Sequence, residues 1–191
     1  MPDREWWAAL WADPEAVLRA MGVHKDMLAV DLCCGDGYFT VPLARITRRT
    51  VYGIDLDPYL VKLASAEADR TEVVPCVFIR GDARELTKLL PERVDYVFLA
   101  NTFHGVDSKT GLAREIRAAL RPNCRFGIVN WHQRPREKTV VLGKARGPQT
   151  GLRMTPEQTQ EAIEPAGFAL ERLIDLPPYH YGAAFLNTVE S

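Results

Sequence analysis

The sequence predicts a three-layer, doubly wound α/β protein, in which helices cover both faces of a mostly parallel sheet. Five short runs rich in β-branched and aromatic residues are apolar along nearly their whole length, as strands buried on both faces are. Helix-like segments separate these runs, which indicates βαβ units with right-handed crossovers. Two last strand-like runs have no helix between them, so one strand of this pair must be antiparallel to the other.

The expected elements alternate along the chain. The five buried strands are Met27–Cys33, Thr50–Asp55, Val73–Ile79, Val94–Ala100 and Phe126–Trp131. The expected helices are Tyr38–Thr47, Pro58–Asp69, Arg84–Leu90, Ser108–Leu120 and Thr155–Ala166. The closing hairpin is Phe168–Asp175 and Tyr179–Val189.

The helix predictions rest on residue spacing and on signals at the helix ends. Leu112, Ile116 and Ala119 recur three and four residues apart, which places one apolar stripe against the sheet. This helix is expected to stop near Pro122, because proline ends a helix. Thr155, followed three residues later by a glutamine, is the pattern of a capped helix start.

Two segments of unusual composition accompany the predicted sheet. Residues 1–24 form an expected N-terminal helical arm that contains Trp6, Trp7 and Trp11. Residues 132–154 contain six lysines or arginines, one glutamate and five glycines or prolines, so we expect a long basic loop or lid there. We expect both segments to belong to a single domain, 1–191.

Composition excludes several classes of partner. The 24 basic and 25 acidic residues give a net charge of −1, which argues against binding nucleic acid through bulk charge. The longest stretch without Asp, Glu, Lys or Arg, 176–189, is too short to span a bilayer, so we expect no membrane partner. The four cysteines form no C-x-x-C pair, and the start of the chain is unlike a signal peptide. We therefore expect a cytoplasmic protein, either a monomer or a homodimer.

The loop after the first strand carries the first signal for a ligand. Asp31 is followed by Gly35 and Gly37, which allow a tight turn and a close approach of a ligand to the backbone. The next helix begins directly after this loop and offers free N–H groups. The two glycines alone would also fit a dinucleotide, but Thr40 stands at the third position of that fingerprint.

Acidic residues follow the second and third strands as well. Asp55 lies where an acid in such folds accepts the hydroxyls of a ribose. Asp82 follows the third strand and is placed to face the exocyclic amine of an adenine. Together with the glycine loop, these acids predict a site for a nucleoside cofactor at the carboxyl edge of the sheet.

These motifs resemble those of the class I S-adenosylmethionine-dependent methyltransferases. The similarity includes 31–37, 53–55, 81–83, 100–104, 120–122 and the final hairpin. It is greatest to the small-molecule branch that includes the quinone-biosynthesis C-methyltransferases, which carry a similar asparagine and histidine after strand four. The resemblance implies a Rossmann-like fold of seven strands in the order 3-2-1-4-5-7-6, with strand seven antiparallel.

The resemblance also implies S-adenosylmethionine as the cofactor. The implied cofactor-binding residues are Asp31, Cys33, Gly35, Gly37, Asp55, Leu56, Asp82, Ala83 and Asn101. Cys33 departs from the family pattern, which usually has a glycine there, and this departure places its sulfur near the methionine end of the cofactor. The alternative interpretation is a nucleotide-binding α/β domain of another kind.

Candidate catalytic residues lie in turns that the family topology brings to one rim. His104 follows the fourth strand, His132 follows the fifth, and Tyr179 and His180 lie in the final hairpin turn. His104 is the first candidate for a base or a substrate-orienting group. Each histidine could instead be an ordinary hydrogen-bonded loop residue, and we predict no metal site.

Two further segments have both a functional and a structural interpretation. The tryptophans of the arm either pack on the sheet or cover an aromatic substrate. The basic loop is either a solvated surface or captures an anionic substrate group through Arg134, Arg136 or Arg146.

The sequence thus predicts an S-adenosylmethionine-dependent methyltransferase that acts on a small molecule, of anionic or aromatic character. Two alternatives remain open. One is a nucleic-acid methyltransferase, although the Asp/Asn-Pro-Pro-aromatic run of the amino-methylating enzymes is absent after strand four. The other is a non-catalytic module that binds the cofactor.

Overall fold

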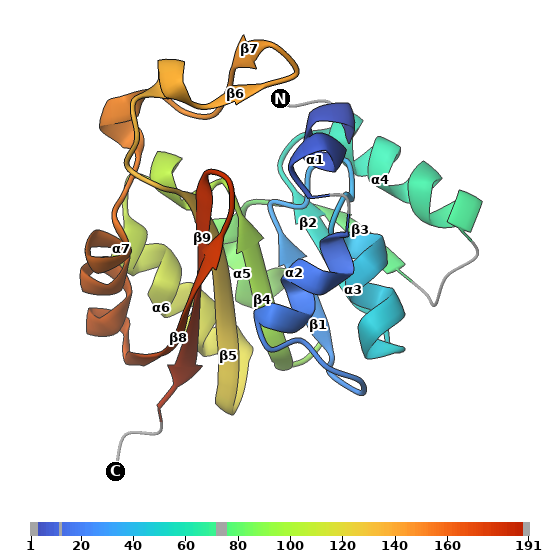
Figure 1. Ribbon diagram of the computed structural model, residues 1–191. Coiled ribbons are helices and arrows are strands. Elements are labelled where there is room, and N and C mark those ends of the chain that lie inside the picture. Colours follow the sequence, from blue (N-terminus) through green and yellow to red (C-terminus); the bar gives the residue numbers. More distant parts are fainter. Residues whose placement is uncertain (1–3, 12, 72–75, 189–191) are drawn as a thin grey trace.

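A seven-stranded sheet in the order β3-β2-β1-β4-β5-β9-β8 forms the centre of the computed structural model, which describes residues 4–11, 13–71 and 76–188 (Figure 1). The strands are β1 (Ala29–Leu32), β2 (Val51–Asp55), β3 (Cys76–Arg80), β4 (Val94–Ala100), β5 (Leu120–Trp131), β8 (Phe168–Leu176) and β9 (His180–Asn187). The first five pair in parallel, and β9 runs antiparallel to both β5 and β8. The predicted fold and strand order are therefore confirmed.

Helices cover both faces of this sheet (Figure 1). On one face lie α1 (Arg4–Leu10), α2 (Pro14–Ala20) and α3 (Thr40–Thr47), with α4 (Pro58–Thr71) packed beside α3. On the other lie α5 (Leu86–Leu89), α6 (Lys109–Ala119) and α7 (Pro156–Ile163). Side chains alternate along β4, so Phe98 enters the first core and Val97 the second. None of the described helices is long and apolar enough to cross a bilayer.

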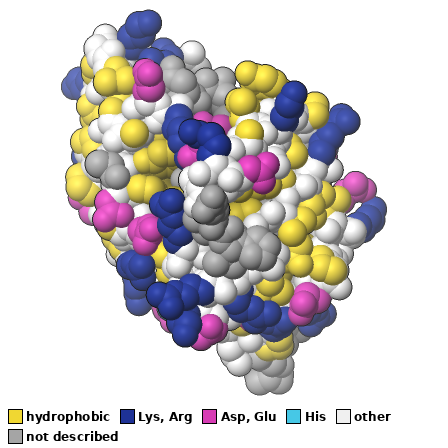
Figure 2. Space-filling model, turned by 90° about the vertical axis from the view of Figure 1, so that its right-hand side faces the viewer, with side chains coloured by type: hydrophobic (Ala, Val, Ile, Leu, Met, Phe, Trp, Pro, Cys, Tyr) yellow, Lys and Arg dark blue, Asp and Glu magenta, His cyan; other side chains and the backbone are white. Residues whose placement is uncertain are grey.

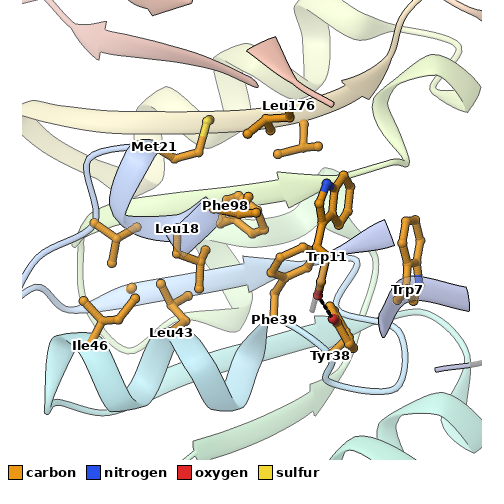
Figure 3. Packing of buried hydrophobic residues seen from close by; sticks show 14 of the residues in the cluster. Trp7, Trp11, Leu18, Met21, Tyr38, Phe39, Leu43, Ile46, Phe98 and Leu176 are labelled. Carbon is orange, nitrogen blue, oxygen red and sulfur yellow. Dashed lines mark hydrogen bonds between the residues drawn. The ribbon is translucent and has the colours of Figure 1, made fainter. Parts of the chain in front are cut away.

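The N-terminal arm is part of the first core. Leu18 of α2 and Met21, directly after this helix, pack with Leu43 of α3 and with Phe98 of the sheet (Figure 3). The Tyr38 hydroxyl donates a hydrogen bond to the backbone carbonyl of Trp11. All three tryptophans of the arm are buried, and α1 lies over the edge of the sheet where β1 and β2 end (Figure 1).

The basic segment 132–154, called the excursion below, folds more fully than the expected loop. It contains the short turns η3 (Arg136–Lys138) and η4 (Thr150–Leu152) and a two-stranded hairpin of β6 (Val140–Val141) and β7 (Lys144–Ala145). Val141 is buried in the core that includes α1. The fully buried Arg153 donates from Nη2 to the Thr139 Oγ1 (2.9 Å) and to the Arg146 carbonyl (3.0 Å). Most of the segment is irregular, as expected of a loop, and these internal contacts replace solvent as its hydrogen-bond partners.

Several element boundaries differ from the predicted ones. β5 begins at Leu120 instead of Phe126, and the pairing with β4 shifts between Leu120 and Arg125, opposite Asp95. The predicted helix 84–90 divides into η1 (Ala83–Glu85) and α5. The predicted start of the third strand, 73–75, lies outside the described residues. The capping box at the start of α7 is confirmed, with Thr155 and Gln158 exchanging hydrogen bonds of 2.9 and 3.2 Å.

Candidate active site

The loop between β1 and α3 turns sharply at the carboxyl edge of the sheet. Cys33, Gly35 and Gly37 all have left-handed backbone angles, with φ of 58°, 58° and 79°. A Cβ on Gly37 would lie 3.0 Å from the Cβ of Ala64 in α4, so the position also needs glycine for space. Helix α3 begins without a side-chain cap.

Asp55, the last residue of β2, ties this loop to the next strand. Its Oδ2 accepts the N–H of Gly35 (2.9 Å) and its Oδ1 accepts the N–H of Asp57 (3.0 Å). A carboxylate offers about four acceptor positions, so about two remain for hydroxyl donors. The adjacent Leu56 is 63% exposed and leaves an apolar surface beside the acid.

Asp82 follows β3 and is largely occupied by its neighbour Arg84. Its Oδ1 accepts the Arg84 backbone N–H (2.9 Å), and the Arg84 Nε lies 3.0 Å from both carboxylate oxygens. These hydrogen bonds lower the pKa of Asp82 to about 2. The half-buried Ala83 begins η1. The Gly81 N–H binds the Asp55 carbonyl (3.0 Å), so the acids at the ends of β2 and β3 lie at adjoining strand ends.

A cavity of about 420 Å³ opens beside this edge, at the ends of β1, β4 and β5. One group of lining residues follows β1 and β4: Asp31, Cys33, Cys34, Gly35, Asp36, Tyr38, Phe39, Ala100, Asn101, Thr102 and His104. A second group comes from α1, β5 and the excursion: Trp6, Trp7, Trp131, Arg136, Arg146, Gly147 and Pro148. The structure therefore brings a polar surface from the strand ends against an aromatic and basic surface from distant segments.

Asp31 is the buried acid of the first group. It is 2% exposed, and its Oδ2 accepts a hydrogen bond of 2.6 Å from the Thr40 hydroxyl. Burial raises the pKa of Asp31 to about 7, although the bond to Thr40 acts in the opposite direction. A cation bound beside this carboxyl would favour its charged form.

Asn101 and His104 contribute polar atoms without protein partners. Asn101 has a left-handed φ of 58°, and its buried amide oxygen and nitrogen bond to no residue that the structure describes. The buried Nδ1 of His104 likewise has no partner in that part of the chain. Burial lowers the pKa of His104, so its imidazole is neutral at neutral pH. Buried polar atoms without partners are unfavourable, which indicates that a polar ligand completes this surface.

The structure does not bring the other predicted catalytic residues to the cavity. His180 is fully buried, with its ring centre 4.0 Å from that of Trp131, and burial holds its pKa well below the usual value. The Nε2 of His132 lies 3.0 Å from the Asp175 Oδ1. The Tyr179 hydroxyl donates to the carbonyl of residue 140 at 3.0 Å. Antiparallel pairing places His180 opposite Trp131, inside the core, so the expected meeting of three histidines does not occur.

Sequence reasoning also missed some lining residues. The sequence placed Trp131 only at the end of a strand, Asp36 only in a turn, and Tyr38 only at the start of a helix. The alternation of side chains along a strand gave a usable signal for Trp131. Consecutive residues such as Trp131 and His132 point to opposite faces of the sheet. Asp36 had no comparable signal, because its position depends on the left-handed turns on either side.

Residues 30–128 match the family model described as a methyltransferase domain. The chain belongs to this family. This methyltransferase-domain protein is similar to sterol 24-C-methyltransferase erg6 of Aspergillus fumigatus, with 26% identity over 179 residues that cover 86% of this chain and 47% of that protein. It is also similar to demethylmenaquinone methyltransferase of Staphylococcus aureus, with 32% identity over 108 residues, or 56% of this chain and 44% of that protein. The chain spans about half the length of the curated relatives it matches.

Solved structures share the fold of this methyltransferase-domain protein. A SAM-dependent methyltransferase from Aquifex aeolicus has a TM-score of 0.82 at 19% identity and covers 98% of this chain and 100% of its own. Magnesium protoporphyrin IX methyltransferase from Synechocystis, with bound SAM, has a TM-score of 0.69 at 16% identity, over 97% and 80% of the two chains. The [4+2]-cyclase SpnF has a TM-score of 0.73 at 18% identity, over 93% and 80%. Because one neighbour is a cyclase, the fold by itself does not establish methyl transfer.

Proposed function

We propose that this protein transfers a methyl group from S-adenosylmethionine to a small-molecule acceptor. The observation that carries the proposal is the buried amide of Asn101, which has no partner among the described residues and lines the same cavity as the buried carboxyl of Asp31. Membership of the methyltransferase domain family supports it. The bound cofactor would supply an electrophilic methyl group on a sulfonium ion.

The residues at the strand ends fit this cofactor. The Asp31 carboxylate and the Asn101 amide match the ammonium and carboxylate groups of its methionine end. The free acceptor positions of Asp55 match the two ribose hydroxyls, and Leu56 offers an apolar contact for the base. Asp82 and Ala83 would contact the adenine, although the Arg84 side chain already donates hydrogen bonds to both carboxylate oxygens of Asp82.

The loop after β1 would hold the centre of the cofactor. Gly35 and Gly37 let the backbone approach it closely, and Cys33 contributes a side chain where the family usually has none. Burial raises the pKa of Cys33 to about 12, so this side chain stays a neutral thiol. A neutral sulfur adds no charge beside the sulfonium.

The acceptor side carries one candidate base. His104 lines the cavity and is neutral, and its buried Nδ1 has no partner among the described residues, so it can accept a proton from the acceptor atom. We assign His132, Tyr179 and His180 supporting roles behind the cavity wall: Tyr179 holds β6, and His180 packs against Trp131.

The acceptor is a small molecule of aromatic or anionic character in this proposal. Helix α1 and the excursion act as lids, because both supply residues that line the cavity and both lie at the same end of the sheet (Figure 1). The face around α4 and β3 mixes both signs of charge with hydrophobic side chains, unlike a nucleic-acid surface (Figure 2). Cys33, Cys34 and Cys124 are free thiols, which supports the cytoplasmic setting that we propose, with a monomer or a homodimer as the working form.

The direct test is isothermal titration with S-adenosylhomocysteine. We expect measurable heat with a one-to-one stoichiometry, and folded protein that gives none contradicts the proposal. A panel of phenolic, thiol and carboxylate acceptors with labelled cofactor then tests catalysis. Binding without transfer to any acceptor of the panel would favour a non-catalytic module.

A further inference from the structure

Two guanidinium groups enclose a pair of indole rings in the wall of the cavity. The guanidinium carbon of Arg146 lies 5.8 Å from the ring centre of Trp6, and that of Arg153 lies 5.0 Å from the ring centre of Trp131. The two tryptophan rings are 6.1 Å apart. This layered arrangement joins α1 to the excursion, and three of its four members line the cavity.

The guanidinium groups of this wall form no close ion pair in the described part of the chain, although the charge of Glu137 acts on Arg153 from a greater distance. Arg136, Arg146 and Arg153 form no ion pair there, and their hydrogen bonds go to neutral acceptors such as the Gly147 carbonyl (3.0 Å from the Arg136 Nε). Arg153 is 2% exposed, and its Nη1 is buried without a partner, as is the Nε of Arg146. Burial of uncompensated cations is unfavourable, so the wall is suited to an anion.

The acids of the cavity do not supply that anion. Burial raises the pKa of Asp36, and the cation that opposes this shift is Arg4, not an arginine of the wall. The Asp31 carboxyl accepts a hydrogen bond from the Thr40 hydroxyl, and in the proposed function it binds the cofactor. The negative charge must therefore come with the molecule that occupies the cavity.

We infer, on the basis of the proposed methyl transfer, that the acceptor is a planar aromatic carboxylic acid. Its ring lies against Trp6 and Trp131, and its carboxylate binds Arg146 and Arg136. Arg153 is a positioning residue, because its Nη2 holds the Arg146 carbonyl and its Nε holds the Pro148 carbonyl (3.2 Å).

The test is isothermal titration of the full chain at neutral pH with 4-hydroxybenzoate, its neutral methyl ester and inorganic phosphate. We expect the acid to bind about tenfold more tightly than either the ester or phosphate. Arg146→Gln should reduce this preference to less than about threefold, while Arg146→Lys keeps part of it. Arg134→Gln is the matched control, because the exposed Arg134 bonds to the Pro178 carbonyl (3.0 Å) and does not line the cavity.

Equal binding of acid and ester, equal binding of phosphate, or an unchanged preference in Arg146→Gln overturns the inference. Circular dichroism checks that each variant is folded, and Arg136→Gln replaces Arg146→Gln if the latter unfolds. Titration with S-adenosylhomocysteine in the same samples separates the two proposals. If that ligand binds and the acid is not preferred, only the inference about the acceptor fails; if that ligand gives no heat, the proposed function fails whatever the acids do.

Discussion

The two halves of the candidate site are built by different kinds of contact. The cofactor half consists of strand ends and the loop after β1, where Asp55 binds backbone N–H groups of Gly35 and Asp57. The acceptor half consists of side chains from segments far apart in the chain, with Trp6 of α1 close to both Trp131 and Arg146. The first half is thus set by backbone geometry, and the second by side-chain packing.

This difference predicts how each half responds to mutation. Changes in the cofactor half should weaken ligand binding with little effect on folding, because the strands that carry it are held by the sheet. Changes in the acceptor half should cost stability as well, because its walls are also core residues. The following experiments test this contrast.

Replacement of Trp131 with alanine should have the largest effect. Its side chain is 2% exposed and contacts His180 and Arg153, so we expect a loss of about 3–5 kcal/mol of unfolding free energy. Urea unfolding measures this loss. Leu173→Ala on β8, where the side chain is 50% exposed, is the control and should cost less than about 1 kcal/mol. A small loss for Trp131→Ala would mean that the acceptor half does not depend on core packing.

Replacement of His104 with glutamine should affect catalysis alone. We expect kcat to fall by about 100-fold or more, because the neutral base is lost, while the affinity for S-adenosylhomocysteine stays the same. Steady-state kinetics with an acceptor from the panel measures the change. His24→Gln, which alters an exposed histidine bonded to the Lys25 carbonyl, should leave kcat unchanged. Full turnover by His104→Gln would remove this residue from the mechanism.

Replacement of Asp55 with alanine should weaken the binding of S-adenosylhomocysteine by about 1–3 kcal/mol, because a charged acceptor is lost. Calorimetry measures this change. Asp57→Ala is the matched control, since the Asp57 Oδ1 accepts only the N–H of Tyr59 (2.8 Å). Asp82→Ala should have a smaller effect than Asp55→Ala, because Arg84 already occupies that carboxylate. A larger loss of affinity in Asp82→Ala than in Asp55→Ala would show that Asp55 is not the acid that binds the ribose hydroxyls.

The buried Asp31 should make both binding and stability depend on pH. Its pKa is raised to about 7 in the folded protein, against about 3.9 in an unfolded chain. Between these values the folded state holds a proton that the unfolded state has lost, so the stability of the ligand-free protein falls as pH rises from about 4 to about 7. The affinity for S-adenosylhomocysteine should instead fall as the pH is lowered, by up to about tenfold, or 1.4 kcal/mol, for each pH unit below 7.

Urea unfolding and calorimetry over this pH range measure the two slopes. Asp31→Asn should flatten both, because asparagine does not titrate, and should bind S-adenosylhomocysteine more weakly at neutral pH. If the stability or the affinity of Asp31→Asn still changes with pH in the same way, the titration of another group causes that change.

Replacement of Cys33 with glycine should have the smallest effect. The left-handed φ of 58° disfavours a side chain, so its removal should change stability by less than about 1 kcal/mol. The affinity for S-adenosylhomocysteine should rise or stay the same, because a thiol leaves the cavity. Thermal unfolding and calorimetry measure the two quantities, and weaker binding would show that the thiol contributes a favourable contact.

Local patterns in the sequence were sufficient for the alternation of strands and helices and for most positions of the cofactor half, whereas the strand order followed from the family resemblance. Apolar runs, end signals such as the Thr155 capping box, and acids at strand ends are each set within a few residues, and the parallel sheet brings those ends together. The predicted element boundaries were wrong where strand pairing set them. Leu120, for example, begins β5 because it pairs with Val94.

The sequence by itself determined the alternation of strands and helices, the glycine loop and the places of Asp31, Asp55, Asp82 and Asn101 at or after strand ends, because each depends on neighbours along the chain. Only the tertiary structure decided that His104 lines the cavity while His180 is buried behind Trp131. It also decided that the excursion folds over α1 and leaves a cationic wall there. The physical reason is that these choices depend on side-chain packing between segments far apart in the chain, and local periodicity carries no information about that packing.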